Sequence, residues 1–290
     1  MYGPLVIAYL FLGGAAAGGM FVMSAWSLAS ARPGGIACAS LRHAQAFNYL
    51  RGRVYPLCFL LLVFAIVMLF WDLERPDRVL LVFLRPHPTP ITFGAFSLSI
   101  EAALAVLLIA SSSGQYPAKG SSRRFVEALC CVCSLAVMAY TGAFLASTKA
   151  VAFWDTWLLM PLFVCSSLSS GLSIMLLVDY LIPDQSLLLR GAKPLQLFHL
   201  AVLAAELIFL ALFVHAAFSN PAAAASCKTL LSADVFPLAC IGVLGFGVFI
   251  PAALETYSLL FRSSRAIPAS DALCLCGSLL LRYCIVICVA

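Results

Sequence analysis

The sequence predicts an all-α integral membrane protein with eight transmembrane helices and almost no chain outside the bilayer. Of its 290 residues, 63% are hydrophobic and 10% are charged, whereas soluble domains carry about 25% charged residues. The apolar residues also gather in stretches of roughly the 20 residues that a helix needs to cross a bilayer. Short connections between these stretches leave no room for a soluble domain, so we expect a single membrane domain over residues 1–290.

Eight stretches qualify as spans. They are Pro4–Ala31, Val54–Trp71, Ile91–Ser112, Phe125–Thr148, Trp154–Ile182, Pro194–Phe218, Val235–Phe261 and Asp271–Ala290. A short repeat suggests that they form two four-helix bundles, residues 1–150 and 151–290. Gly94-Ala95-Phe96 precedes Glu101 in the third span, and Gly247-Val248-Phe249 precedes Glu255 in the seventh. Spans that are four apart run in the same direction, as two parallel bundles require.

The distribution of lysine and arginine predicts the orientation in the membrane. The first, third, fifth and seventh loops hold eleven of these residues, and the other three loops hold five. Because cytoplasmic loops carry the excess of positive charge, we expect both termini to face outward. Trp71, Trp154 and Trp157 then lie together at the outer interface, as an aromatic belt. The net charge of +5 is too small and too dispersed to indicate nucleic-acid binding.

The cysteines and histidines do not predict a cofactor in this chain. Most of the twelve cysteines lie in apolar runs, where cysteine packs as a small hydrophobe, and no partner motif that could complete a metal site lies near the Cys130/Cys131/Cys133 group. His199 and His215 lie on one predicted helix, roughly 24 Å apart at 1.5 Å per residue, so they cannot ligate one haem. We therefore expect no haem, no Fe–S cluster and no other metal.

Ionisable side chains inside spans are costly and are therefore candidates for function. The main ones are Glu101, Glu206, Glu255 and Arg282. Two interpretations stay open: a structural pairing of Arg282 with one of the carboxylates, or proton transfer by the three glutamates. Four acidic residues near span ends are expected to be solvated instead. These are Asp72, Glu127, Asp155 and Asp179.

Several strings, in order along the chain, carry a family resemblance. They are Tyr9-Leu10-Phe11-Leu12-Gly13-Gly14, Asp72-Leu73-Glu74-Arg75-Pro76, Tyr140-Thr141-Gly142, Phe153-Trp154 with Pro161, and Leu281-Arg282-Tyr283. Together they resemble the NrfD/PsrC family, the membrane subunits of polysulfide reductase-like and related molybdenum or cytochrome oxidoreductases. The resemblance extends over nearly the whole chain.

This resemblance implies a quinone-reactive anchor in the bacterial cytoplasmic (inner) membrane. The anchor exchanges electrons between menaquinol or another quinol, such as ubiquinol, and an extracytoplasmic four-cluster Fe–S subunit, with a molybdopterin catalytic subunit beyond. Tyr140 matches the tyrosine of the family's YTG string at the quinone site, and we add Tyr9, Asp72 and Thr141 as candidates. Two phenols and a carboxylate offer the hydrogen bonds and proton transfer that a quinone headgroup needs.

A secondary transporter or proton-coupled permease is the alternative from another class. Transporters of this kind have spans broken by glycine or proline, with charges near the midplane. Pro161 and Pro251 lie within spans, and Glu101 and Glu206 lie near mid-membrane by residue count. A purely structural anchor without quinone chemistry is the third possibility.

Overall fold

The computed structural model describes residues 3–30, 41–72, 89–112, 120–148, 151–181, 185–260 and 268–288. Every regular element in these ranges is a helix, and eight of the helices are long and apolar enough to cross a membrane. The predicted all-α fold with eight spans is therefore confirmed.

The eight spans have the following bounds: α1 (Pro4–Ser30), α3 (Leu41–Asp72), α5 (Pro90–Ser112), α6 (Gly120–Ala146), α7 (Leu159–Tyr180), α8 (Gln185–Ser219), η3 (Leu238–Phe249) continued by α10 (Ile250–Leu260), and α11 (Pro268–Ile287). Two short helices, η2 (Pro221–Ala223) and α9 (Ala224–Leu230), join α8 to η3. The first half of the seventh span is a π-helix, which is wider than an α-helix.

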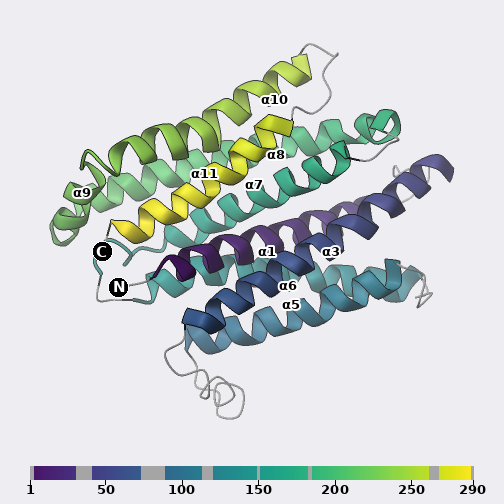
Figure 1. Cartoon of the computed structure of the whole chain (residues 1–290), viewed down its shortest axis with the longest axis horizontal. Helices are drawn as coiled ribbons and strands as arrows, with labels where there is room; N and C mark the ends of the chain where they lie inside the picture. Colours follow the sequence, from purple (N-terminus) through teal and green to yellow (C-terminus); the bar gives the residue numbers. More distant parts are fainter. Residues whose placement is uncertain are drawn as a thin grey trace.

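The helices lie side by side along one direction, and the two chain termini lie at the same end of the molecule (Figure 1). We call this the terminal end; α1, α5, α7 and η3 begin there, and the other four spans end there. Helix α1 contacts α3, α6 and α7, while α7 also contacts α6, α8 and α11. The division into two four-helix bundles stays a prediction, because α1 and α7 join the two halves through extensive contacts.

Glycines permit the closest helix crossing, between α1 and α7. A Cβ atom on Gly18 would lie 1.9 Å from the carbonyl oxygen of Ser167, and one on Gly171 would lie 2.1 Å from the carbonyl carbon of Gly18. Small residues let helix backbones approach in this way in membranes, where van der Waals contact drives helix association. Helices α1 and α7 are accordingly the most enclosed spans: 72% of the residues in the apolar stretch of each are buried, against 28% in α3 and α8.

The start of the fifth span differs from the sequence prediction. Helix α7 begins at Leu159, and a turn precedes it. This turn directs Trp154 inward, where its side chain is 2% exposed and its Nε1 donates to the carbonyl oxygen of Ile285 at 3.0 Å. Trp154 is therefore not part of an aromatic belt, because its indole N–H has a partner inside the protein. Trp71 and Trp157 are 72% and 84% exposed.

Candidate functional site

Two buried tyrosines lie together in the half of the molecule nearer the terminal end. Tyr9 follows five residues after the start of α1, and Tyr140 lies six residues before the end of α6. Their side chains are 1% and 4% exposed, and their phenol groups lie close enough to interact electrostatically. The hydroxyl of Tyr9 faces that of Tyr140 and has no other hydrogen-bond partner among the residues that the structure describes. Buried polar groups with unfilled hydrogen-bonding capacity are costly, so the pair of phenols is a place where a ligand oxygen would be favourable.

A glycine of α5 makes room for the ring of Tyr140. A Cβ atom on Gly94 would lie 2.0 Å from Cζ of Tyr140 and 2.3 Å from its two Cε atoms. These distances are far below van der Waals contact, so the ring rests directly on the α5 backbone. This role of Gly94 was not predictable from the sequence, since the contact joins residues 46 positions apart on different helices.

The other two predicted quinone residues have different surroundings. The Thr141 side chain is 1% exposed, and its Oγ1 donates to the carbonyl oxygen of Met138 at 2.7 Å, within its own helix. Asp72 is half-buried at the end of α3, where its Oδ1 lies 3.3 Å from the place that a Cβ of Gly3 would take. Asp72 is thus at the rim of the terminal end, roughly 9 Å along α1 from Tyr9 at 1.5 Å per residue.

Arg282 of α11 is completely buried and ties three helices together. Its Nε donates to the carbonyl oxygen of Leu10 at 3.1 Å, Nη1 to Ser166 Oγ at 3.2 Å and to Ser278 Oγ at 2.5 Å, and Nη2 to Ser167 Oγ at 2.9 Å. The rings of Phe11 and Phe163 flank the guanidinium group. Hydrogen bonds to a charged donor are strong, and together they offset the cost of burying the charge. The hydrogen bond to the carbonyl oxygen of Leu10 also holds the α1 backbone in place directly next to Tyr9.

No carboxylate forms a direct ion pair with Arg282 among the described residues. Glu206 of α8 interacts with it electrostatically, and the hydroxyl of Ser166 lies between the two groups with a hydrogen bond to Glu206. The structural pairing that the sequence left open is therefore indirect. Serine hydroxyls and backbone carbonyls surround the guanidinium group, and the nearest carboxylate acts through one of them.

The three predicted proton-transfer residues lie in three separate environments. Glu101 of α5 is fully buried, its Oε1 accepts a hydrogen bond from Ser134 Oγ at 2.7 Å, and its Oε2 has no partner in the described ranges. Glu206 lies against Ser166, as described above. Glu255 of α10 accepts a hydrogen bond from Nδ1 of His199 at 2.6 Å. His199 also interacts electrostatically with Glu206, so polar groups follow one another from Arg282 to Glu255 in the second half of the chain.

A large apolar groove lies in the second half of the chain, toward the terminal end. It has a volume of about 590 Å³, and side chains of α8, η3 and α11 line it, among them His215, Leu281 and Cys284. Phe153 and Leu281 belong both to this groove and to the hydrophobic cluster that includes the two tyrosines. The groove has the size and apolar lining that an isoprenoid or acyl chain requires.

Comparison with protein families identifies the chain. The family model described as polysulphide reductase, NrfD, matches residues 1–290, which is the whole sequence. The chain belongs to the NrfD family. NrfD proteins are membrane subunits of oxidoreductase complexes and are associated with quinones and with molybdenum enzymes. No curated protein matches this chain. The resemblance carried by the Tyr9, Tyr140 and Arg282 strings is thus confirmed.

In this NrfD protein, sequence reasoning missed a buried ion pair at the end opposite to the termini. Glu127 of α6 was expected to be solvated, but it is 1% exposed. Its Oε1 accepts from Ser27 Oγ at 2.7 Å and from Arg123 Nε at 3.1 Å, and Arg51 Nη1 lies 3.5 Å away. The expectation was wrong because α1 packs against this face of α6 and Arg51 of α3 reaches Glu127, which the sequence does not reveal. Asp271, a further missed residue, is 2% exposed.

Proposed function

We propose that this NrfD protein is the quinone-reactive membrane anchor of an oxidoreductase complex and that Tyr9 and Tyr140 bind the quinone headgroup. One observation supports this most strongly: two buried phenols from α1 and α6 converge, and the Tyr9 hydroxyl has no partner other than Tyr140 among the described residues. A phenol donates to a quinone oxygen and accepts from a quinol hydroxyl. The same pair thus suits both redox forms of the substrate.

Quinol oxidation at this site releases two electrons and two protons and leaves the quinone. We propose that the electrons pass to an extracytoplasmic four-cluster Fe–S subunit and from there to a molybdopterin catalytic subunit; quinone reduction is the same exchange in reverse. Asp72 lies at the rim of the terminal end, where a carboxylate can exchange protons with water. The partner subunits would dock at this end, because it is the one nearer to the tyrosines.

The proposed orientation is that the terminal end faces the outside of the bacterial inner membrane. It is supported by the charge count alone, with eleven lysines and arginines in the loops that the sequence predicts for one side, some of them in the helix ends there, and five for the other side. Under this orientation, both the quinone headgroup and the Fe–S partner are extracytoplasmic. Protons from quinol oxidation would then leave directly to the outside.

We further propose that Glu101, Glu206 and Glu255 are able to carry protons through the interior. Glu101 has one oxygen without a partner in the described part of the chain, and Ser134 holds the other. Glu206 and Glu255 are linked by His199. Buried carboxylates in such positions within a membrane typically serve proton transfer or structural pairing, and neither Glu101 nor Glu206 has a direct ion pair among the described residues.

The transporter alternative receives less support. A transporter site of the discontinuous-helix type requires a span that unwinds near its middle. The seventh span, which holds Pro251, stays helical from Leu238 to Leu260 through its change from π- to α-helix. The fifth span, with Pro161 in its first turn, is likewise continuous from Leu159 to Tyr180.

Binding of a short-chain quinone to the purified chain tests the proposed site. We expect that Tyr9→Phe, which removes the hydroxyl that faces Tyr140, weakens binding about 2–10-fold, the equivalent of one neutral hydrogen bond. Tyr49→Phe is the matched control, since Tyr49 is 45% exposed on the part of α3 that lies toward the opposite end. Unchanged affinity in Tyr9→Phe, with normal folding by circular dichroism, would place the headgroup elsewhere.

A further inference from the structure

Three ionisable side chains converge near the end opposite to the termini, away from the tyrosines. His199 of α8, Glu255 of α10 and Asp271 of α11 each offer one ligand atom, and these atoms all lie within 4.8 Å of one another. The three residues are 0%, 5% and 2% exposed. They come from three different helices, so their convergence is a product of the tertiary fold.

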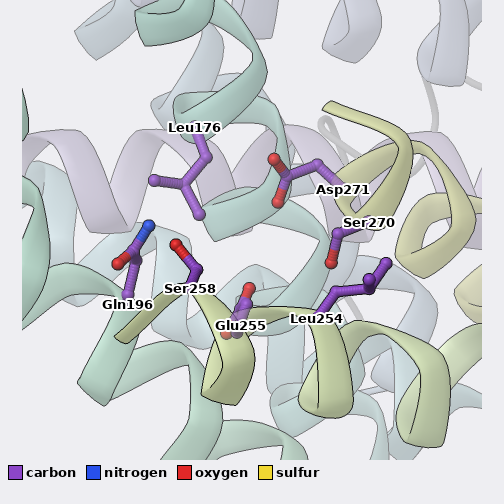
Figure 2. A pocket seen from close by; sticks show the side chains of 7 residues that line it. All are labelled: Leu176, Gln196, Leu254, Glu255, Ser258, Ser270 and Asp271. Carbon is purple, nitrogen blue, oxygen red and sulfur yellow. The ribbon is translucent and has the colours of Figure 1, made fainter. Parts of the chain in front are cut away.

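A small pocket beside these residues contains several polar atoms without partners (Figure 2). Oε2 of Glu255, Oγ of Ser270 and Oδ1 of Asp271 are all buried, and none has a hydrogen-bond partner within the described ranges. Figure 2 shows the side-chain oxygens of these residues around the same space, with Gln196 and Ser258 on its other side. Buried polar atoms in native proteins nearly always have partners. Three unpartnered atoms in one pocket therefore indicate a bound species that supplies the missing interactions.

The imidazole ring of His199 has the orientation of a metal ligand. Its Nε2 lies 3.2 Å from Oγ of Ser169 and 3.7 Å from Sγ of Cys274. Its Nδ1 faces Oε1 of Glu255 at 2.6 Å. In metal sites the second ring nitrogen of a histidine is usually held by a polar partner, which fixes the ring. Ser169 provides that partner here, and Nδ1 is left facing Glu255.

The charges of the cluster favour a cation. Glu255 and Asp271 interact unfavourably with each other, and both interact with His199. Among the described residues, neither carboxylate forms an ion pair with lysine or arginine. The nearby Glu206 adds a further acidic group on the side of His199. Two carboxylates in so enclosed a place repel each other strongly unless a positive charge lies between them.

We propose that His199, Glu255 and Asp271 bind a divalent first-row metal ion, with Zn²⁺ as the ion that best fits the set. Zinc takes imidazole nitrogen and carboxylate oxygen at about 2.0–2.2 Å, frequently with three protein ligands and one open position. Atoms already within 4.8 Å of one another need only small side-chain rotations to reach one ion. The metal takes the place of the Nδ1 proton between His199 and Glu255, and this proton is released on binding, so proton transfer through Glu255 requires the metal-free form of the site.

The hydroxyl of Ser270 then lies near the open position, as a hydrogen-bond partner for Asp271 or for a bound water. Asp271 is in the first turn of α11, so an ion reaches the site from the nearby end of the span. By joining α8, α10 and α11, the metal holds the helices of the second half together. The sequence predicted no metal, because its ligands are 56 and 16 residues apart and form no local motif.

Metal analysis of the purified full-length chain tests this proposal. After removal of metal with a chelator, addition of Zn²⁺ and gel filtration, we expect about one Zn²⁺ per chain in the wild type. Asp271→Asn should lose most of it, and Glu101→Gln, a change at a buried carboxylate of α5, should retain it. Co²⁺ in place of Zn²⁺ should give visible absorption bands in the wild type that Asp271→Asn lacks.

A second test uses the wild-type protein alone and does not depend on whether a variant folds. Binding to the native state raises the melting temperature, so Zn²⁺ should raise that of the metal-free wild type. A wild type that holds no Zn²⁺ and does not change its melting temperature would overturn the proposal. Equal zinc content in wild type and in folded Asp271→Asn would overturn it too.

Discussion

Replacement of Gly94 by alanine tests whether the position of the Tyr140 ring matters for function. The added Cβ would lie 2.0 Å from Cζ of Tyr140, whereas non-bonded carbon atoms prefer about 3.5–4.0 Å. The ring, or helix α5, must therefore move by roughly 1.5–2 Å. Overpacking of this kind costs about 1–3 kcal/mol of stability. A misplacement of about 1 Å at a reacting group can lower turnover 10²-fold, so we expect a large loss of quinol turnover in a protein that still folds.

The control for this change is Gly52→Ala, because a Cβ on Gly52 meets no atom within 4 Å. The assay is quinol-dependent reduction of the Fe–S partner in membranes with matched expression, together with the melting temperature of the purified chain. In a double-mutant cycle, Gly94→Ala should cost much less stability in a Tyr140→Ala background than in the wild type, since the clash requires both side chains. Normal turnover in Gly94→Ala, at a stability close to that of Gly52→Ala, would refute the claim that the ring rests on α5 and that its position is functional.

Three further predictions concern other parts of the molecule. Arg282→Gln should lower the stability of the chain by about 3 kcal/mol or more, measured by melting temperature, because three serines and the Leu10 carbonyl lose a charged donor; a melt like that of the wild type would contradict the network. Glu127→Gln should lower the free energy of unfolding by about 3 kcal/mol, since it leaves Arg51 buried without its counter-ion. Arg123→Ala, at the more exposed partner, should lower it by under about 1 kcal/mol. Equal losses of stability in the two variants would argue against this difference. In a cysteine-free background, an impermeant thiol reagent should label a cysteine at position 88 but not one at 121 in intact cells, and the reverse pattern would invert the proposed orientation.

The spans were predictable because the bilayer core permits few backbone conformations. In hydrocarbon every backbone group must be paired within the segment, so a long apolar stretch becomes a helix. The predicted span Ile91–Ser112 agrees with α5 (Pro90–Ser112) to within one residue. The start of the fifth span was missed because Phe153 and Trp154 are apolar enough to extend the hydropathy signal into a buried turn.

The contacts between buried polar groups were not predictable in the same way. Tyr9 and Tyr140 were each singled out by a family string and by depth, but nothing in the sequence placed them against each other. Arg282 was recognised as costly to bury, yet its side-chain partners are serines. A serine in an apolar helix does not indicate that it contacts a buried arginine. Glu127 shows the limit most clearly, because distance from a span end does not reveal which helices cover a side chain.

The rate of quinol-dependent reduction of the Fe–S partner by Tyr140→Phe tests the central claim most directly. The substitution keeps the ring and its contact with Gly94 and removes only the hydroxyl. We expect turnover to fall about 10²–10⁴-fold if the phenol transfers a proton, or affinity for quinol to fall about 2–10-fold if it only donates a hydrogen bond. Tyr49→Phe should behave as the wild type. Normal turnover together with normal quinol affinity in Tyr140→Phe would contradict the proposal that this tyrosine binds the quinone.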